Sequence, residues 1–239
     1  MSSEKIEFNK ENIDIYLKEL AKEYKKEIGK NMPAEIILIG GASVLVNYGF
    51  RDMTTDIDAL IRAASVMRDI INRIGDRYQL PNGWLNQDFI QTESYSPELI
   101  RFSKFYKTYS GVLTIRTIAA EYLIAMKLRS GRQYKSDLSD VLGILAEHEK
   151  RDEPITLERI QQAVIDLYGS WDALSETSRS FISNAMDDGR FSELYAQTIV
   201  GEKESKELLL GFEQEYPGVT KETNLESILA QLRARKTEK

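Results

Sequence analysis

The spacing of apolar residues in the first part of the chain predicts alternating helices and strands. Apolar side chains recur at three- and four-residue steps over 10–29, as on one face of an amphipathic helix. The run at 35–39 is almost wholly apolar and rich in β-branched residues, which is typical of a strand buried on both faces. A short helix is expected at 42–48, closed by Gly49, and the alternation over 56–61 predicts a second strand.

Helical and strand patterns continue to alternate up to about residue 150. A helix with one apolar face is followed by two strands joined by a tight turn, and then by two further helices. The first helix is expected at 63–78, the strands at 100–107 and 111–117, and the next helix at 118–130. The last helix is expected to run to about His148, with Ser136 as its N-cap.

Beyond Pro154 the pattern is helical throughout. This change, together with a change in charge, predicts a boundary between residues 1–150 and a helical subdomain at 151–239. The predicted fold class is α+β: a small mixed β-sheet flanked by helices, followed by an all-α C-terminal region. The expected C-terminal helices are 156–168, 173–187, 190–200, 203–214 and 222–235.

Composition narrows the chemistry that the chain can perform. The 239 residues include no cysteine and one histidine, which excludes disulfides, thiolate metal sites, cysteine nucleophiles and any site built on two imidazoles. No apolar run approaches the ~18 residues of a membrane span, and the acidic, polar N-terminus is unlike a signal peptide. We therefore expect a cytoplasmic protein without a membrane partner, whose chemistry uses carboxylates, lysine, arginine, hydroxyls and backbone amides.

The charge is distributed unevenly along the chain. Residues 1–150 carry equal numbers of basic and acidic side chains, so the net charge of −6 falls on 151–239. Within the neutral part, 99–135 carries eight basic side chains against one acid, Glu121. Such a stretch can attract phosphates, as in RNA, and it can equally consist of solvated side chains on helix and hairpin surfaces.

The most informative segment begins with two glycines after the first predicted strand. Gly40 and Gly41 end the strand, and the short helix starts immediately after them. Glycine allows a ligand to approach the backbone closely, and the first turn of a helix offers N–H groups to a phosphate. Ser43 can add a hydroxyl donor. This diglycine turn, Gly40 to Ser43, is therefore a candidate phosphate-binding turn.

Two carboxylates follow on the second predicted strand. Asp56 and Asp58 are two residues apart, so their side chains emerge on the same face of a strand. Neighbouring carboxylates repel each other unless a cation neutralises them, and oxygen ligands favour Mg²⁺ or Mn²⁺. We call Asp56 and Asp58 the acid pair and expect it to bind metal next to a nucleotide; the alternative is a tight turn beside a solvated acidic strand.

Six segments share their order and spacing with one known family: Gly40–Ser43, Tyr48–Arg51, Thr54–Asp58, Leu80–Asn86, Ala125–Leu128 and Arg132–Asp140. They resemble the nucleotidyltransferase fold of the polymerase-β type. The finer likeness is to bacterial proteins related to the AbiE-type abortive-infection toxins, and it covers about residues 34–148.

The resemblance implies an activity and further site residues. It implies Mg²⁺-dependent transfer of a nucleotidyl group from an NTP to a hydroxyl acceptor, such as a tRNA end or a protein side chain, with an antitoxin-like protein partner. It assigns phosphate binding to the diglycine turn, metal binding to the acid pair, a position near the nucleotide phosphates to Lys127, and a catalytic role to Asp137. Without the resemblance, Lys127 would be interpreted as a surface lysine, and Asp137 as a residue that stabilises the start of a helix.

One departure from the fold's usual pattern keeps a second function open. Many proteins of this fold carry a third metal-binding carboxylate on a later strand, and the candidate strand at 112–116 has none. The alternative function is therefore a catalytically inactive nucleotide-binding or protein-interaction module on the same fold.

Three smaller features each allow two interpretations. Arg51 can steady Asp56 or a phosphate, or pair with a nearby acid. Trp84 is expected in the core rather than stacked on a base. The aromatic residues interleaved with basic ones over 101–109 suit an RNA-facing hairpin, although we favour a hairpin that packs one aromatic face on the sheet.

Overall fold

A computed structural model of the chain describes residues 7–221 and 224–237. By its packing the chain divides into a first unit, Met1–Met126 with Glu158–Ala173, and a second unit, Lys127–Leu157 with Leu174–Lys239. This division differs from the sequence-predicted boundary near residue 150. The sequence pattern shows where strand-forming segments stop, whereas the units are set by helix packing. Helix α5 (Asp137–Lys150) packs against α8 (Phe191–Glu215), which lies much later in the chain.

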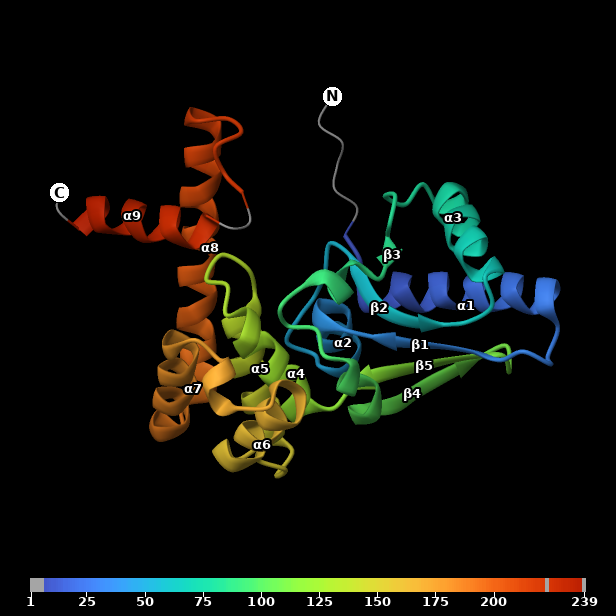
Figure 1. Cartoon of the computed structure of the whole chain (residues 1–239), viewed down its shortest axis with the longest axis horizontal. Helices are drawn as coiled ribbons and strands as arrows, with labels where there is room; N and C mark the ends of the chain where they lie inside the picture. Colours follow the sequence, from blue (N-terminus) through green and yellow to red (C-terminus); the bar gives the residue numbers. More distant parts are fainter. Residues whose placement is uncertain (1–6, 222–223, 238–239) are drawn as a thin grey trace. The chain divides into compact units, whose positions relative to one another are not determined.

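The first unit contains a five-stranded mixed sheet, as predicted (Figure 1). The strand order is β3-β2-β1-β5-β4; β1 pairs parallel with β5 and antiparallel with β2, β3 is parallel to β2, and β4 is antiparallel to β5. The strands are β1 (Ala34–Leu38), β2 (Ile57–Arg62), β3 (Leu85–Asn86), β4 (Ser103–Tyr109) and β5 (Leu113–Ile118).

The turn between β4 and β5 confirms the predicted hairpin. Ser110 and Gly111 both have positive φ angles, of 53° and 69°. Two successive residues with positive φ are typical of the two-residue turn that matches the twist of antiparallel strands. The two-residue strand β3 is not predicted, because so short a segment carries no periodic pattern.

Three helices of the first unit, at 10–28, 40–47 and 66–78, pack against this sheet, and α4 continues from the first unit into the second. The helices are α1 (Lys10–Ile28), α2 (Gly40–Asn47), α3 (Val66–Tyr78), α4 (Ala120–Ser130) and α6 (Leu157–Tyr168), with short 3-10 helices η1 (Asp88–Gln91), η2 (Pro97–Phe102) and η3 (Trp171–Ala173).

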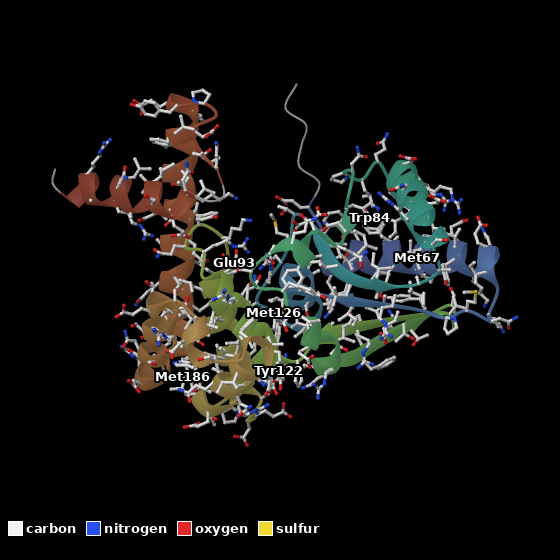
Figure 2. The ribbon with its side chains drawn as sticks, in the orientation of Figure 1. Met67, Trp84, Glu93, Tyr122, Met126 and Met186 are labelled. Carbon is white, nitrogen blue, oxygen red and sulfur yellow. The ribbon has the colours of Figure 1, made fainter. Side chains whose placement is uncertain are left out.

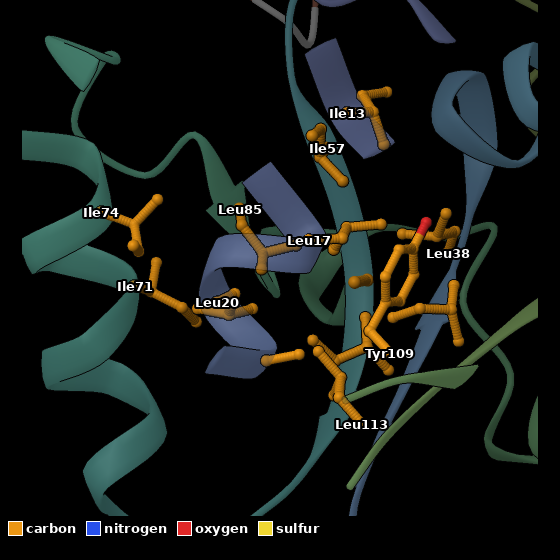
Figure 3. Close-up of a cluster of buried hydrophobic side chains, with 14 of the residues drawn as sticks. Ile13, Leu17, Leu20, Leu38, Ile57, Ile71, Ile74, Leu85, Tyr109 and Leu113 are labelled. Atoms are coloured by element: carbon orange, nitrogen blue, oxygen red, sulfur yellow. The ribbon is translucent and has the colours of Figure 1, made fainter. Parts of the chain in front are cut away.

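A hydrophobic core lies between the sheet and the helices α1 and α3 (Figure 3). Leucines of α1 and isoleucines of α3 meet the apolar face of β1, β2 and β5 there, as the periodicity of each segment predicts. Trp84, labelled in Figure 2, is 3% exposed, and its Nε1 donates a hydrogen bond of 3.0 Å to the carbonyl of Ile71. This confirms that Trp84 is a core residue.

The second unit is helical. The predicted helices at 190–200 and 203–214 form one continuous helix, α8, so the predicted break is wrong. Gly201 lies inside α8, and a single glycine weakens a helix by about 1 kcal/mol without ending it. The helices are α5 (Asp137–Lys150), α7 (Glu176–Asp188), α8 (Phe191–Glu215) and α9 (Leu225–Thr237). Within the described ranges, no helix combines the length and the apolar character that crossing a bilayer requires.

Candidate functional site

The diglycine turn lies where β1 meets β2 in the first unit. Helix α2 begins at Gly40, whose φ of +53° is a left-handed conformation that glycine adopts without steric penalty. The backbone N–H of Ile39 donates a hydrogen bond of 2.9 Å to the carbonyl of Asp58. The end of β1 is thereby fixed beside the start of β2, and the turn comes to lie next to the acid pair.

Asp58 lies directly against the first glycine. A Cβ atom added at Gly40 would be 3.7 Å from Oδ2 of Asp58, an ordinary contact distance. Asp58 is half-buried, whereas Asp56 precedes β2 and is exposed. The structure therefore brings the diglycine turn and a carboxylate of the acid pair to the same end of the sheet, where β1 finishes and β2 begins.

Arg51 and Thr54 cover the second glycine. A Cβ atom at Gly41 would lie 2.7 Å from Oγ1 of Thr54, 2.9 Å from Nη2 of Arg51 and 3.2 Å from its Cζ. The first two distances are too short for a real carbon atom, so a side chain at residue 41 would require Thr54 and Arg51 to shift. A cationic and a hydroxyl side chain thus reach this turn from the segment before β2.

Ser43 joins α2 to β5. Its side chain is fully buried, and its hydroxyl oxygen accepts a hydrogen bond of 3.2 Å from the backbone N–H of Ile118. Asn47 extends the junction, because its Nδ2 donates to the carbonyl of Ser43 and its Oδ1 accepts from Thr117. These contacts fix α2 on the sheet; phosphate binding by Ser43 stays a prediction.

The carboxylate oxygens at this end of the sheet are donor atoms that suit Mg²⁺ in the presence of a nucleotide. Within 7–221 and 224–237, no three acidic or imidazole side chains are placed to hold a metal, and β5 carries no acid. Mg²⁺ commonly binds through one or two carboxylates, several waters and substrate phosphates. The acid pair therefore fits a divalent ion that arrives with a triphosphate, rather than a metal held by protein ligands alone.

Lys127 and Asp137 belong to the second unit, where they form part of a buried ion cluster. Nζ of Lys127 lies 2.9 Å from Oδ1 of Asp137 and 2.8 Å from Oδ2 of Asp140. Nε of Arg132 lies 2.7 Å from the other oxygen of Asp137. We call these four residues the charge cluster; both of its carboxylates are almost fully buried.

The electrostatics of the charge cluster keep Asp137 ionised. Burial alone would raise the pKa of this carboxyl group, but Lys127 and Arg132 outweigh burial and lower the pKa to about 2. A carboxylate with so low a pKa is a weak proton acceptor at neutral pH. The geometry accounts for Asp137 as an ion-pair residue, and its catalytic role stays a prediction.

Glu202 is a residue that sequence reasoning missed. It extends from α8 and accepts hydrogen bonds of 3.1 Å from the backbone N–H groups of Leu138 and Ser139, in the first turn of α5. Ser136, the predicted N-cap of α5, makes no capping bond with its side chain. Burial raises the pKa of Glu202 to about 7, and the nearby Asp140 carboxylate acts in the same direction.

The nucleotide-binding prediction agrees with a family that the comparisons found. A family model described as "Nucleotidyltransferase of unknown function (DUF6036)" matches residues 16–149. The match includes the diglycine turn, the acid pair and the charge cluster. Neither the curated proteins nor the solved structures gave a significant match to this chain.

Proposed function

The chain belongs to this family of nucleotidyltransferases, and from that premise we propose that it transfers a nucleotidyl group from an NTP to a hydroxyl acceptor with the help of Mg²⁺ or Mn²⁺. The observation that carries the proposal is the contact between Asp58 and the diglycine turn, with Oδ2 3.7 Å from the Cβ position of Gly40. A carboxylate for the metal and a backbone turn for the phosphates are thereby neighbours.

The chain's own groups would bind and orient the nucleotide. The turn at Gly40 and Gly41 offers backbone N–H groups to phosphate oxygens. Asp56 and Asp58 would hold the divalent ion, which, when bound, neutralises phosphate charge that develops during transfer. The acceptor oxygen bonds to the α-phosphorus, the bond from that phosphorus to the β-phosphate oxygen breaks, pyrophosphate leaves, and the hydroxyl proton passes to water.

The finer parts of the proposal rest on the resemblance to AbiE-type toxins. They are an RNA acceptor such as a tRNA end, or else a protein side chain, and an antitoxin-like protein partner. The basic stretch at 99–135 is compatible with RNA, because cationic side chains attract the phosphate backbone.

A second candidate function is nucleotide binding without turnover. One observation favours it: strand β5, the later strand of the sheet, carries no third carboxylate. Such a module would retain the diglycine turn and would bind NTP without labelling any acceptor.

The experiment that tests transfer uses α-labelled NTPs, Mg²⁺ and mixed RNA and protein acceptors. Asp56→Asn and Asp58→Asn should each reduce labelling by more than about 100-fold, because even outer-shell changes at metal sites cost 10–100-fold. Asp52→Asn is a matched control, since Asp52 is an exposed acid just before the acid pair. It should label at the wild-type rate.

The possible results separate the two functions. Labelling by the wild type that both acid-pair variants lose supports the transferase. NTP binding without labelling under all acceptor and metal conditions supports the second candidate and refutes transfer. Labelling that survives in Asp56→Asn and Asp58→Asn would show that the acid pair does not hold the metal.

A further inference from the structure

Arg51 occupies a defined position beside the diglycine turn. Its guanidinium lies over Gly41, with Nη2 2.9 Å and Cζ 3.2 Å from the place where a Cβ atom would stand. A guanidinium approaches a backbone this closely only where no side chain intervenes. The absence of a side chain at residue 41 therefore leaves room for both Arg51 and Thr54.

The segment that carries Arg51 is held in place by its own contacts. Nε of Arg51 donates a hydrogen bond of 3.0 Å to the carbonyl of Met53. Thr54 is buried and exchanges two backbone hydrogen bonds of 2.8 Å with Phe8. The guanidinium is thus oriented from one side by its own loop, while the loop is anchored to the N-terminal segment.

Side chains of opposite charge lie beside the two glycines. Asp58 lies against Gly40, and Arg51 lies against Gly41, the next residue. A metal–triphosphate has the matching order of charges, since a cation and anionic phosphate oxygens are adjacent in it. Guanidinium binds phosphate with two parallel hydrogen bonds, which makes arginine a stronger phosphate ligand than a single ammonium.

We propose that Arg51 is a phosphate-binding residue of this site, and that it contacts the β- or γ-phosphate of the triphosphate beside Gly41. This inference rests on the proposed nucleotide site, but it concerns binding rather than transfer. It gives the segment between α2 and β2 the role of a phosphate clamp.

The role of Gly41 follows from the same geometry. A methyl group at residue 41 would come too close to both Arg51 and Thr54. The backbone of Thr54 is fixed by Phe8, so the side chains of Arg51 and Thr54 are the groups that must move. Gly41→Ala should therefore weaken phosphate binding even though it leaves the charge of every side chain unchanged.

The test measures binding of inorganic tripolyphosphate by calorimetry, with a chelator present to remove divalent ions. We expect Arg51→Ala to bind about 10- to 100-fold more weakly, as for loss of a charge-assisted hydrogen bond. The affinity of Arg51→Lys for tripolyphosphate should lie between those of Arg51→Ala and the wild type, because lysine retains the charge without the planar pair of donors. Arg62→Ala is the matched control: Arg62 ends β2, has an exposed side chain and pairs with Glu35. It should bind as the wild type does.

Asp58→Asn separates this inference from the proposed transferase. The variant loses a negative charge beside the turn, so it should bind metal-free tripolyphosphate more tightly than the wild type does, although it should not transfer. If Arg51→Ala fails to fold, Arg51→Lys and Gly41→Ala carry the test.

The outcomes are decisive for Arg51. Weaker binding in the Arg51 variants and in Gly41→Ala, with Arg62→Ala unchanged, supports the clamp whether or not the wild type labels an acceptor. Unchanged affinity in the Arg51 variants overturns the clamp and leaves Arg51 as a structural residue, even if transfer is observed. Absence of any tripolyphosphate binding to the wild type also overturns it.

Discussion

The acid pair of the first unit and the charge cluster of the second unit use the same kind of side chain in opposite surroundings. Asp56 is exposed and Asp58 is half-buried, and Asp58 lies beside the diglycine turn. Asp137 and Asp140 are 1% and 2% exposed, and a lysine lies within 2.9 Å of each. The carboxylates of the acid pair are thus closer to solvent, whereas those of the charge cluster are buried together with their cationic partners.

The difference shows why a residue's type and spacing do not establish its role. Lys127 has the charge that a phosphate ligand needs, but a phosphate that bound to it would compete with two carboxylates. Arg51, in the first unit, lies against the diglycine turn itself. Burial among charged partners therefore indicates that Lys127 stabilises the fold, and position beside the diglycine turn makes Arg51 the better candidate for binding a substrate.

The largest effect is expected where the charge cluster is broken. Lys127→Met should reduce the free energy of unfolding of the second unit by about 3–5 kcal/mol, because it leaves two buried carboxylates without their shared cation. Asp56→Asn, in contrast, should change the stability of the first unit by less than about 0.5 kcal/mol, because Asp56 is exposed. Urea unfolding monitored by hydrogen exchange can measure both units separately.

A matched control for this comparison is Lys135→Met, since Lys135 is exposed in the segment before α5. Its stability should be close to that of the wild type. A loss of less than about 1 kcal/mol in Lys127→Met would refute the structural role of the cluster. It would favour Lys127 as the phosphate residue that the family resemblance implies.

The next largest effect concerns the pH dependence of the second unit. The pKa of Glu202 is raised from 4.5 to about 7, so the folded state binds more protons than the unfolded state between these values. Stability should therefore fall by about 2–3 kcal/mol as pH rises from 4.5 to 7, and then level off. Glu202→Gln keeps an acceptor oxygen for the two N–H groups and should remove this fall.

Thermal unfolding at pH 5 and pH 8 checks this prediction. Glu204→Gln is the control, because Glu204 is an exposed residue of the same helix. It should retain the wild-type pH dependence. An identical pH dependence in Glu202→Gln and the wild type would show that the carboxyl group of Glu202 titrates normally.

Much of the fold could be predicted because periodicity is a local property of the sequence. The repeat over 10–29 corresponds to α1 at Lys10–Ile28, and the apolar run at 35–39 to β1 at Ala34–Leu38. The diglycine turn and the acid pair could likewise be located, because the turn directly follows the first predicted strand and the acid pair lies at the start of the second.

Contacts between distant segments could not be predicted in this way. Glu202 is more than 60 positions from the N–H groups that it caps, and nothing in its local sequence distinguishes it from the other glutamates of α8. The covering of Gly41 by Arg51 depends on a loop conformation for which no pattern exists. The continuity of α8 through Gly201 is set by packing, which outweighs the propensity of one residue.

The smallest effect should come from the diglycine turn itself. Gly40→Ala should reduce stability by about 1–2 kcal/mol, because its φ of +53° disfavours any residue with a Cβ atom. Gly49→Ala is the control, since no atom lies within 4 Å of its Cβ position and its φ is not positive. Equal stabilities of the two variants in urea unfolding would contradict the backbone conformation of the turn.

The central claim is that the acid pair and the diglycine turn together bind a divalent ion and a triphosphate. A crystal soaked with Mn²⁺ and a non-hydrolysable NTP tests it directly through the anomalous signal of manganese. We expect manganese about 2.1 Å from carboxylate oxygens of Asp56 and Asp58, with the phosphates at the start of α2. A triphosphate bound elsewhere, or manganese absent from the acid pair, would contradict the claim.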